Sequence, residues 1–354
     1  MSWSFHAALE TFDQFRGRWD ALNVSRNNHI LLDSGFVAIL LHYAESRDVV
    51  LAVNEDAGNP AMALLERKTS GVWETFQPSW APLGLFLCGE GGHVGENVLS
   101  LTRALPGYAL QLSVLQQDPD YSALTAVDHC DWIEKSDYAQ TARIALAGTF
   151  HEYWETREQK FRKNNDRRRR RLAEKGSLDL NLIRDPAAVK DAIREFGRLE
   201  SKGWKANGGT AVAADNTQGH LYRAVLEYFC KRGEGVIYQL RIDGQVIATD
   251  LCVSRGEMFV LLKNTYDEEW SAYAPGVLLR EDIVRGLCTE ERVWNYEFYG
   301  PLMDYQLRWT QDIRTLYHVT CFRHPWVRTA RDFAKGIRNQ PPKVSHPVCS
   351  ETEL

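Results

Sequence analysis

Three apolar runs of strand length lie between residues 236 and 266, and this pattern is the most informative in the chain. The pairs Asp243-Gly244 and Arg255-Gly256 separate the runs. A glycine-containing pair between two such runs is typical of a β-hairpin. The pattern therefore predicts an antiparallel meander of three strands. After a polar loop, residues 277–287 carry apolar positions at helical spacing, so we expect a helix directly after the meander.

The two halves of the chain repeat one order of elements. For the first half the pattern predicts helices at 8–22, 34–47 and 94–105 and strands at 49–53, 61–67, 72–77 and 108–115. For the second half it predicts helices at 186–205 and 218–232, the meander, the helix after Pro275, and strands at 293–298 and 314–322. The order of elements repeats, whereas the residues do not. We expect the α+β class with two similar domains, each a mixed, mostly antiparallel sheet flanked by helices.

Length and composition agree with this division. The chain has 354 residues, which fits two domains of ordinary size. We predict a first domain over 1–148, a basic connecting helix over 149–177, a second domain over 178–335 and a disordered tail over 336–354. The formal net charge of -5 argues against a dedicated nucleic-acid binder.

Cysteines and apolar runs bear on the compartment. The seven cysteines are scattered without a C-x-x-C pair, which favours free thiols in a reducing compartment. The N-terminal sequence lacks the basic and apolar regions of a signal peptide. The most apolar run, Phe36–Leu41, is far too short to span a membrane. We expect a cytoplasmic protein without a membrane span, and its oligomeric state stays unknown.

The helix after the meander begins at Pro275-Gly276. Proline suits the first helical turn, where its missing N–H would have no partner, and glycine lets a ligand approach the backbone. A helix N-terminus at a sheet edge is a ready site for an anion, and it suits the pyrophosphate of an acyl-CoA. We expect the strand that bears Lys263 to part from its neighbour and leave a slot whose floor is this helix N-terminus.

Four stretches resemble one group of acyltransferases. They are ESKGWK at 200–205 with GTAV at 209–212, LKNTYD at 262–267, APGVLL at 274–279, and EFYG at 297–300 with Tyr305 and Trp309. In this order they resemble the GNAT-like acyltransferases of the cellulose-biosynthesis CelD type, whose tandem domains also occur in Fem-type peptidyl transferases. Ala274 stands where that group has serine, and Gln306 where it often has lysine. The ordinary GNAT phosphate signature, Q/R-x-x-G-x-G/A, is absent.

The resemblance implies a donor and its site. The co-substrate would be an acyl-CoA, acetyl-CoA first of all, and no metal is expected. Pro275, Gly276, Val277 and Leu278 would bind the cofactor, with the backbone N–H groups of the last three on the pyrophosphate.

Acyl transfer to an amine also needs a base. An amine with a pKa near 10.4 is mostly ammonium at neutral pH, so a carboxylate must help to remove its proton before it attacks the thioester. The candidates are Glu200, Asp250, Asp267 and Glu297. Each could instead be an ordinary solvated or salt-bridged residue, and the choice among them stays open.

Lys263 is a further catalytic candidate, together with Tyr266 and Asp267 of the LKNTYD stretch. Strand alternation predicts Phe259, Leu261 and Lys263 on one face. A lysine on an apolar face needs a carboxylate or water, and the strands of Asp250 and Glu297 could adjoin it. Lys263 could then orient the substrate; an exposed lysine at a strand end is the alternative.

Substrate-binding candidates follow from the same stretches. They are Glu200, Trp204, Lys205, Thr210, Tyr305 and Trp309. The glycine-rich loop after Lys205 could line the acceptor pocket. Tyr305 and Trp309 could stack on a sugar or on the pantetheine arm, and packing in the core is the alternative for a single tryptophan.

Two further motifs carry alternatives. The basic run Arg167–Arg171 would suit tRNA or another polyanion, but helical spacing spreads its side chains around the helix, which favours a solvated linker. Asp128-His129-Cys130-Asp131 has side chains that bind metals, but adjacent residues do not readily converge on one ion. No metal site is therefore predicted.

We expect an acyl-CoA-dependent N- or O-acyltransferase that transfers groups other than aminoacyl groups. A small-molecule or saccharide acceptor would attack the thioester directly with the help of a general base, in polysaccharide or cell-envelope metabolism. The alternatives are a Fem-type transferase that uses aminoacyl-tRNA, the only nucleic acid considered, and a catalytically inactive GNAT-like scaffold.

Overall fold

The structure is a computed structural model that describes residues 3–56, 58–89, 92–122, 131–202, 215–290 and 292–338. The helices are α1 (Ala8–Val24), α2 (Ser34–His42), α3 (Val94–Ala104), α4 (Phe150–Glu155), α5 (Gln159–Ala173), α6 (Val189–Lys202), α7 (Thr217–Lys231), α8 (Pro275–Leu287) and α9 (Pro325–Arg338). The strands are β1 (Trp3–Ala7), β2 (Val50–Asn54), β3 (Ala61–Thr69), β4 (Val72–Thr75), β5 (Phe86–Cys88), β6 (Gln111–Gln117), β7 (Ile133–Leu146), β8 (Leu178–Ile183), β9 (Gly235–Ile242), β10 (Gln245–Arg255), β11 (Met258–Tyr266), β12 (Trp294–Glu297) and β13 (Asp312–Phe322).

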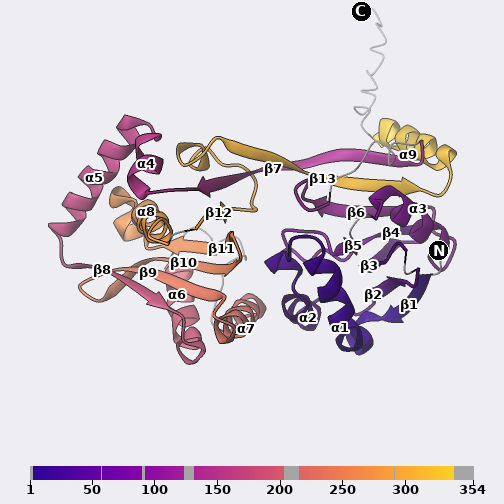
Figure 1. Cartoon of the computed structure of the whole chain (residues 1–354), viewed down its shortest axis with the longest axis horizontal. Helices are drawn as coiled ribbons and strands as arrows, with labels where there is room; N and C mark the ends of the chain where they lie inside the picture. The colour runs from indigo at the N-terminus through magenta and orange to yellow at the C-terminus, as the bar shows by residue number, and fades with distance from the viewer. Residues whose placement is uncertain are drawn as a thin grey trace, which may run out of the picture.

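All these strands belong to one sheet, which forms two lobes that follow the same plan (Figure 1). In the first lobe, β1-β2-β3-β4-β6 ends in a parallel pair of β4 and β6; in the second, β8-β9-β10-β11-β12 ends in a parallel pair of β11 and β12. The helices α1 and α2 follow β1 as α6 and α7 follow β8, and α3 precedes β6 as α8 precedes β12. The predicted α+β class, with two domains of mostly antiparallel sheet flanked by helices, is confirmed.

Each lobe receives one strand from the other. β7 follows β6 in the chain but pairs with β12 of the second lobe, and β13 follows β12 but pairs with β6 of the first. β7 and β13 also pair with each other along Asp312–Cys321. The sheet therefore passes without a break from one lobe to the other, and the junction consists of backbone hydrogen bonds.

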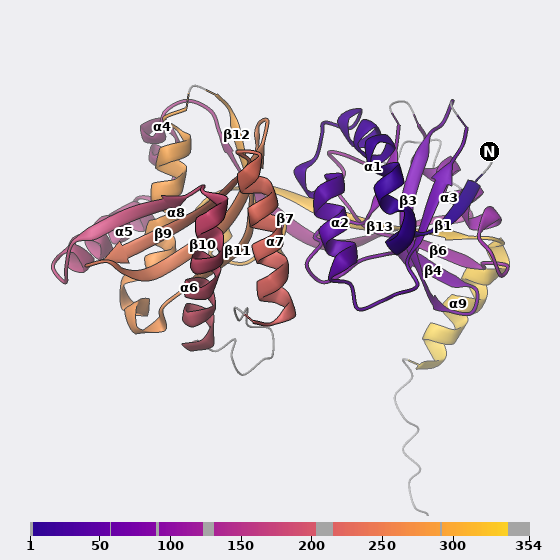
Figure 2. The same cartoon turned by 90° about the horizontal axis from the view of Figure 1, so that it is seen from below.

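One hydrophobic core extends through both lobes on the face that carries α1, α2, α6 and α7. Figure 2 shows α2 and α7 facing each other between the lobes. Their ring contact joins Phe36 and Phe229, with centroids 6.3 Å apart. A Cβ on Gly35 would lie 2.1 Å from Cζ of Tyr228, so only glycine permits this approach of the two helices. On the other face, α8 and α3 cover separate cores of the two lobes.

Most predicted elements are present, and the differences have physical causes. The predicted connecting helix over 149–177 is two helices, α4 and α5, because Thr156 caps the first and the chain turns before Gln159. The strands β1, β5, β7 and β8 were not predicted; much of β7 is exposed, so few apolar residues mark it. α9 occupies 325–338, and the rest of the predicted tail lies outside the described residues. The domain boundaries stay predictions. β13 lies within the predicted second domain but pairs with β6 of the first lobe.

A buried ion pair connects the lobes beside α2. Nη2 of Arg255 on β10 lies 2.7 Å from Oδ2 of Asp33, the N-cap of α2, and Nε lies 2.8 Å from Oε1 of Glu234. The hydroxyl of Tyr228 also donates to Asp33, at 2.8 Å. Burial opposes ionisation of Asp33, but the hydrogen bonds from Arg255 and Tyr228 hold its pKa below the ordinary value.

Replacing Arg255 with methionine should lower the free energy of unfolding by about 3 kcal/mol at pH 7, because Asp33 would stay buried without its cation. A lowered carboxyl pKa gives stability that is present above about pH 4 and lost as the pH falls through the folded-state value. The difference between the proteins should therefore shrink below that pH. Urea unfolding followed by tryptophan fluorescence measures it. Arg194→Met, which removes an exposed pair with Asp191, should cost less than about 1 kcal/mol; equal effects of the two variants would contradict the assignment.

Candidate active site

The parallel strands β11 and β12 are paired only along the first residues of β11. Their register joins Met258–Val260 to Asn295–Glu297. Beyond this point β11 continues to Tyr266 beside β10, whereas Tyr299 turns the other chain segment away with a φ of 47°. A left-handed tyrosine costs about 1–2 kcal/mol, so this turn must be held by other contacts. The strand that bears Lys263 thus parts from its neighbour and leaves a slot, as predicted.

A β-bulge lies in β11 where the strands part. The register with β10 steps from Cys252↔Leu261 to Leu251↔Lys263, which leaves Leu262 as the extra residue. A bulge reverses the alternation of side chains along the strand. Lys263 therefore lies on the face that carries α6 and α7. The prediction that it shares a face with Phe259 and Leu261 is wrong for this reason.

The carboxylate beside Lys263 belongs to Glu200 on α6. Its Nζ lies 3.3 Å from Oε2 of Glu200 and donates to Oε1 of Gln218 at 3.3 Å. The Glu200 side chain is fully buried, and the ring centroid of Tyr222 lies 5.6 Å from the ammonium. The structure thus brings two predicted site residues together. The partner of Lys263 is Glu200 and not the expected Asp250 or Glu297.

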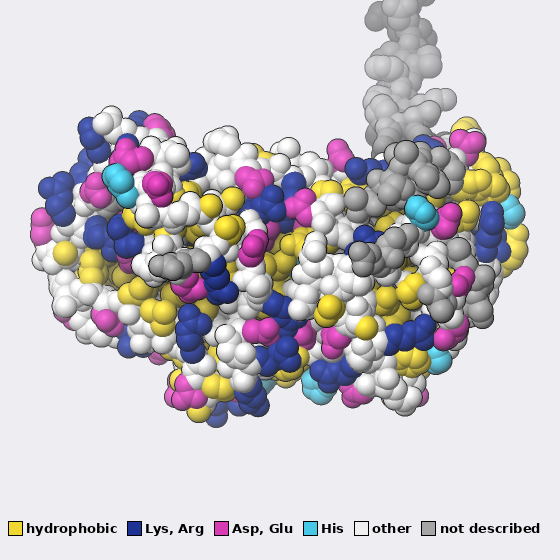
Figure 3. Space-filling model, in the orientation of Figure 1, with side chains coloured by type: hydrophobic (Ala, Val, Ile, Leu, Met, Phe, Trp, Pro, Cys, Tyr) yellow, Lys and Arg dark blue, Asp and Glu magenta, His cyan; other side chains and the backbone are white. Residues whose placement is uncertain are grey.

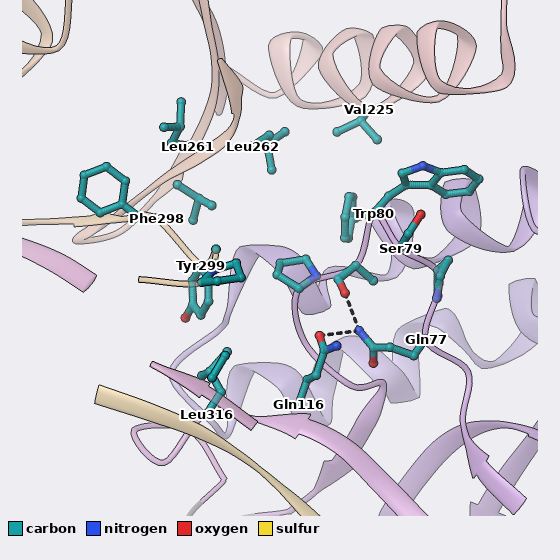
Figure 4. A pocket seen from close by; sticks show the side chains of 18 of the residues that line it. Gln77, Ser79, Trp80, Gln116, Val225, Leu261, Leu262, Phe298, Tyr299 and Leu316 are labelled. Atoms are coloured by element: carbon teal, nitrogen blue, oxygen red, sulfur yellow. Dashed lines mark hydrogen bonds between the residues drawn. The ribbon is translucent and has the colours of Figure 1, made fainter. Parts of the chain in front are cut away.

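A cavity of about 400 Å³ occupies the space where the slot opens between the lobes. Both sides of the slot line it, through residues 260–262 of β11 and residues 298–301 after β12. The remaining walls come from α2 and α7, from the first-lobe loop 77–82, and from Gln116, Tyr138, Ala139 and Leu316 (Figure 4). No lining residue comes from α8 within the described part of the chain.

Glu297 ends β12 at the point where the slot begins. Its register partner in β11 is Val260, a cavity-lining residue, and side chains opposite each other in a sheet share a face. Oε2 accepts a hydrogen bond from Nη2 of Arg314 at 2.9 Å, and Oε1 lies 3.8 Å from Nη1 of Arg143. Burial raises the pKa of Glu297 to about 7, against the opposing effect of Arg314. A carboxylate with this pKa can accept a proton near neutral pH.

Arg314 on β13 holds a second carboxylate, Asp118, which follows β6. Nη2 and Nε of Arg314 donate to Asp118 at 2.7 and 3.0 Å. Burial opposes the ionisation of Asp118, but the hydrogen bonds and charge of Arg314 hold its pKa below the ordinary value. Two carboxylates on one guanidinium therefore differ: Asp118 stays ionised while Glu297 titrates near neutrality. Such a divergence is typical of carboxylates with different tasks, and it makes Glu297 a candidate for the base.

A hydrogen-bonded chain from the first lobe holds the turn at Tyr299. The backbone N–H of Leu31 donates to Nδ1 of His29 at 3.1 Å, so the hydrogen of this imidazole sits on Nε2 and points to the Tyr299 hydroxyl at 2.7 Å. That hydroxyl donates to Oδ2 of Asp118 at 2.9 Å. Burial lowers the pKa of His29 to about 3, so the ring is neutral. These contacts fix the left-handed residue that opens the slot.

Two polar atoms of this cluster have no hydrogen-bond partner among the described residues. They are Oε1 of Glu297 and Nη1 of Arg314. Buried polar groups in proteins are nearly always paired. The cluster therefore holds one acceptor and one donor without a hydrogen-bond partner in the described residues, and neither Glu297 nor Arg314 is among the residues that line the cavity.

Asp250 lies on the opposite face of the sheet. It is fully buried, and its Oδ2 is 3.8 Å from Nη2 of Arg280 on α8. Nε of Arg280 donates to the Tyr296 hydroxyl at 3.4 Å. Burial raises the pKa of Asp250 to about 6. The sheet separates Asp250 from Glu297, so the structure does not bring these two predicted carboxylates into one site.

The N-terminus of α8 offers fewer amides than predicted. Ala274 begins the helix with φ 50° and ψ 57°, and its carbonyl accepts from the N–H groups of Val277 and Leu278 at 2.9 and 3.3 Å. Pro275 has no N–H. Within the described residues, the Gly276 amide is therefore the one of the predicted three that has no backbone acceptor.

The basic helix α5 packs beside this N-terminus. Arg169 donates to the carbonyl of Leu278 at 3.3 Å and lies 2.8 Å from Oδ1 of Asp282. Arg171 lies over the ring of Tyr273, 5.6 Å from its centroid. Lys and Arg side chains (dark blue) are visible over α5 at the left edge of Figure 3. Part of the basic run therefore fixes α5 to α8, and part of it leaves positive charge near the helix start.

The other predicted residues take several positions. Tyr266 is half exposed and adjoins Gly276. Asp267 is buried and caps the 3-10 helix Glu268–Tyr273 by accepting from the N–H of Glu269. Tyr305 lies over Arg280 at the surface. Trp309 is buried in the core under α8, where Trp154 and Phe161 contact its ring, so its contact with a substrate stays only a prediction. Trp204, Lys205 and Thr210 lie outside the described residues.

Sequence reasoning missed Asp118, Arg143, Arg314, His29 and Tyr299. A signal for Asp118 was its place directly after an apolar strand. Arg143 and Arg314 become neighbours of Glu297 only through the exchange of β7 and β13, which no local pattern records. His29 of the first lobe contacts Tyr299, which follows Glu297 closely in the sequence.

The described residues contain neither a metal cluster nor a membrane-spanning helix. Among the residues that the structure describes, no three His, Cys, Asp or Glu side chains gather as a metal site would require. Nor does any helix in the described ranges have both the length and the apolarity needed to cross a bilayer.

Comparisons with known proteins agree with this geometry. Residues 159–307 match a family described as an acetyltransferase (GNAT) domain. No curated protein matches the chain. Among solved structures, the C-terminal domain of a putative lysylphosphatidylglycerol synthetase from Agrobacterium fabrum has a TM-score of 0.57 at 11% identity, covering 92% of this chain and 96% of its own. FemX has 0.55 at 10%, covering 93% and 99%. The L-PGS of Bacillus licheniformis has 0.52 at 11%, covering 92% and 97%.

At these identities the structures show the fold alone. The matched GNAT domain contains β11, the slot, α8 and Glu297, and the first lobe repeats its plan of strands and helices. The chain thus has the fold of two GNAT-like domains in tandem, a fold of the acyltransferase type.

Proposed function

We propose that this protein transfers an acyl group from a CoA thioester to an amine or hydroxyl, with Glu297 as the general base. The observation that carries the proposal is the buried Glu297, which has one oxygen without a hydrogen-bond partner in the described residues and a pKa of about 7, and which pairs in register with the cavity-lining Val260. The resemblance of the second half to CelD-type enzymes supports an acceptor from polysaccharide or cell-envelope metabolism.

The proposed reaction uses both the slot and the cavity. The pantetheine arm would enter the slot between β11 and β12, and the acceptor would occupy the cavity between the lobes. As the acceptor attacks the thioester carbonyl, its proton passes to Oε1 of Glu297, and the bond between carbonyl carbon and sulfur then breaks. The thiolate of CoA leaves and takes up the proton. Arg314 holds Glu297 in place, and no covalent enzyme intermediate is needed.

The surroundings of the α8 N-terminus suit the phosphates of such a donor. Gly276 offers an amide to an anion. A Cβ added at Gly276 would lie 3.7 Å from Cδ1 of Tyr266, which is an ordinary contact distance. Nearby on α5, burial and the like charges of Arg308 and Arg167 lower the pKa of Arg168. A partly buried arginine among other arginines favours the binding of an anion between them.

A Fem-type transferase that uses aminoacyl-tRNA is the second candidate. The observation that favours it is the position of Arg167 and Arg170, which are exposed on α5 beside the predicted donor site. A polyanion of that size would contact more of the helix than a CoA molecule does.

Replacing Glu297 with glutamine should lower the rate of acetyl-CoA hydrolysis, in which water stands in for the acceptor, by about 10²–10⁴-fold. Glutamine keeps the acceptor for Arg314 but cannot take the proton. In the wild type the base must be ionised, so the rate should rise through about pH 7 and then level off. Release of the CoA thiol measures the rate. Glu257→Gln, in the exposed turn before β11, is the control; an unchanged Glu297→Gln rate would remove this residue as the base.

Replacing Asp118 with asparagine should move the acid limb of that pH profile to lower pH. The Asp118 charge raises the pKa of Glu297 and shares Arg314 with it, so without that charge Arg314 stabilises ionised Glu297 more strongly. Asp118 would then act as a positioning residue. A lower rate with an unmoved pH profile would mean that Asp118 has only a structural part.

Replacing Gly276 with tryptophan should weaken CoA binding by at least about tenfold, because the side chain would cover the helix N-terminus. Isothermal titration calorimetry with CoA measures it. Gly286→Trp, at an exposed position near the other end of α8 with open space around it, should bind as the wild type does. No heat of binding in any of the three proteins would refute a CoA donor.

Filter binding of aminoacyl-tRNA separates the second candidate from the first. A Fem-type enzyme should retain the tRNA, and Arg167→Gln together with Arg170→Gln should reduce retention and its dependence on salt. A CoA-dependent enzyme should show neither effect while its calorimetric signal with CoA is unchanged.

A further inference from the structure

The cavity between the lobes has a neutral wall. None of its lining residues in the described part of the chain is Asp, Glu, Lys, Arg or His. Aromatic and aliphatic side chains dominate, with Trp80 and Phe36 from the first lobe and Tyr222, Leu262 and Phe298 from the second. Hydrophobic side chains (yellow) are visible in the hollow between the lobes in Figure 3. A charged group on a ligand would lose its water here without gaining a partner in the lining.

Charged side chains that lie over the lining residues Tyr299 and Tyr222 are ion-paired. Arg314 is held between Asp118 and Glu297, and Lys263 lies beside the buried Glu200. These pairs keep the local charge balanced. The cavity therefore selects against ions on the basis of its surroundings as well as its lining.

The volume is too large for an acetyl group. At about 400 Å³ the cavity lies within the roughly 300–1,000 Å³ of sites that enclose whole small molecules. A carbonyl and a methyl group alone would leave most of this space unfilled. The apolar side chains of the wall favour a ligand with hydrocarbon to bury, and its neutral polar side chains, such as Ser79 and Tyr138, favour uncharged polar groups.

The far wall offers neutral polar side chains. Nε2 of Gln77 donates to Oε1 of Gln116 at 3.0 Å and also to the carbonyl of Ala81. Oε1 of Gln77 and Nε1 of Trp80 are buried without a hydrogen-bond partner within the described ranges. Figure 4 shows Gln77, Gln116 and Trp80 across the cavity from Leu261, Leu262 and Phe298. Both atoms belong to neutral groups, which suit a hydroxyl or an amide better than an ion.

We propose that this cavity binds the uncharged body of a substrate that carries both hydrocarbon and neutral polar groups. That chemistry could come from two sources, the acyl chain of the donor or the body of the acceptor. The inference rests on the proposed function for the reaction in which the ligand takes part. Binding of the ligand itself can be measured separately.

The first arm of the test titrates acetyl-, butyryl-, hexanoyl- and octanoyl-CoA into the protein by calorimetry. If the acyl chain fills the cavity, each added methylene should tighten binding by up to about fourfold, which corresponds to about 0.8 kcal/mol. Succinyl-CoA, the charged counterpart of butyryl-CoA, should bind more weakly than butyryl-CoA. Ala139→Trp should abolish the gain in affinity with chain length, because Ala139 lines the cavity beside its strand partner Leu316. Ala145→Trp, at an exposed position farther along β7, should preserve it.

The second arm uses 1-hexanol, hexanoate and hexylammonium as probes in ligand-observed NMR saturation transfer. The proposal expects a signal for 1-hexanol alone, lost in Ala139→Trp and retained in Ala145→Trp. A gain with acyl length identifies the donor chain as the ligand. A hexanol signal without that gain identifies the acceptor. Equal binding of charged and neutral probes, or the same behaviour of both tryptophan variants in both arms, would overturn the proposal. If no CoA thioester binds, the proposed function fails while the hexanol arm still decides on the cavity.

Discussion

Backbone pairing between β7 and β13 is the constraint on which the candidate site depends. The strands β6, β13, β7 and β12 lie side by side in this order, although they come from opposite halves of the chain. Asp118, Arg314, Arg143 and Glu297 lie on or next to these four strands in the same order. Each strand brings a charged residue to one region of the sheet. The cluster around Glu297 is therefore a product of the exchange between lobes and belongs to neither lobe alone.

Electrostatic balance in this cluster explains how a carboxylate can be buried and still be useful. Removing a carboxylate from water is costly unless it is paired. Arg314 reduces that cost for Glu297, but it also serves Asp118, so it does not hold Glu297 strongly ionised. Asp250 shows the other outcome: it faces Arg280 in the core under α8, on the side of the sheet away from the cavity. Burial raises both pKa values, but Glu297, unlike Asp250, lies on the face of the sheet that carries the cavity, opposite the lining residue Val260.

Local patterns predicted much of the fold and part of the site. Turn residues and hydrophobic periodicity are local features of the sequence. They determine the hairpins, the start of α8 and the repeated order of elements. The parting of β11 from β12 also followed, since a helix begins soon after β11. Lys263 was assigned to the wrong face because one extra residue, Leu262, reverses strand alternation, and a bulge has no reliable mark in the sequence. The partners of Glu297 required the pairing of β7 with β13, which joins residues far apart in the chain.

The exchange of strands has a consequence for any attempt to isolate the catalytic half. The segment that matches the GNAT family, 159–307, contains Glu297 but omits both β7 and β13. A protein cut to that segment would present β12 as an open sheet edge and would lose both guanidinium groups that face the carboxylate. Such an edge invites pairing with other chains. The smallest unit that can preserve the site therefore includes strands from both lobes.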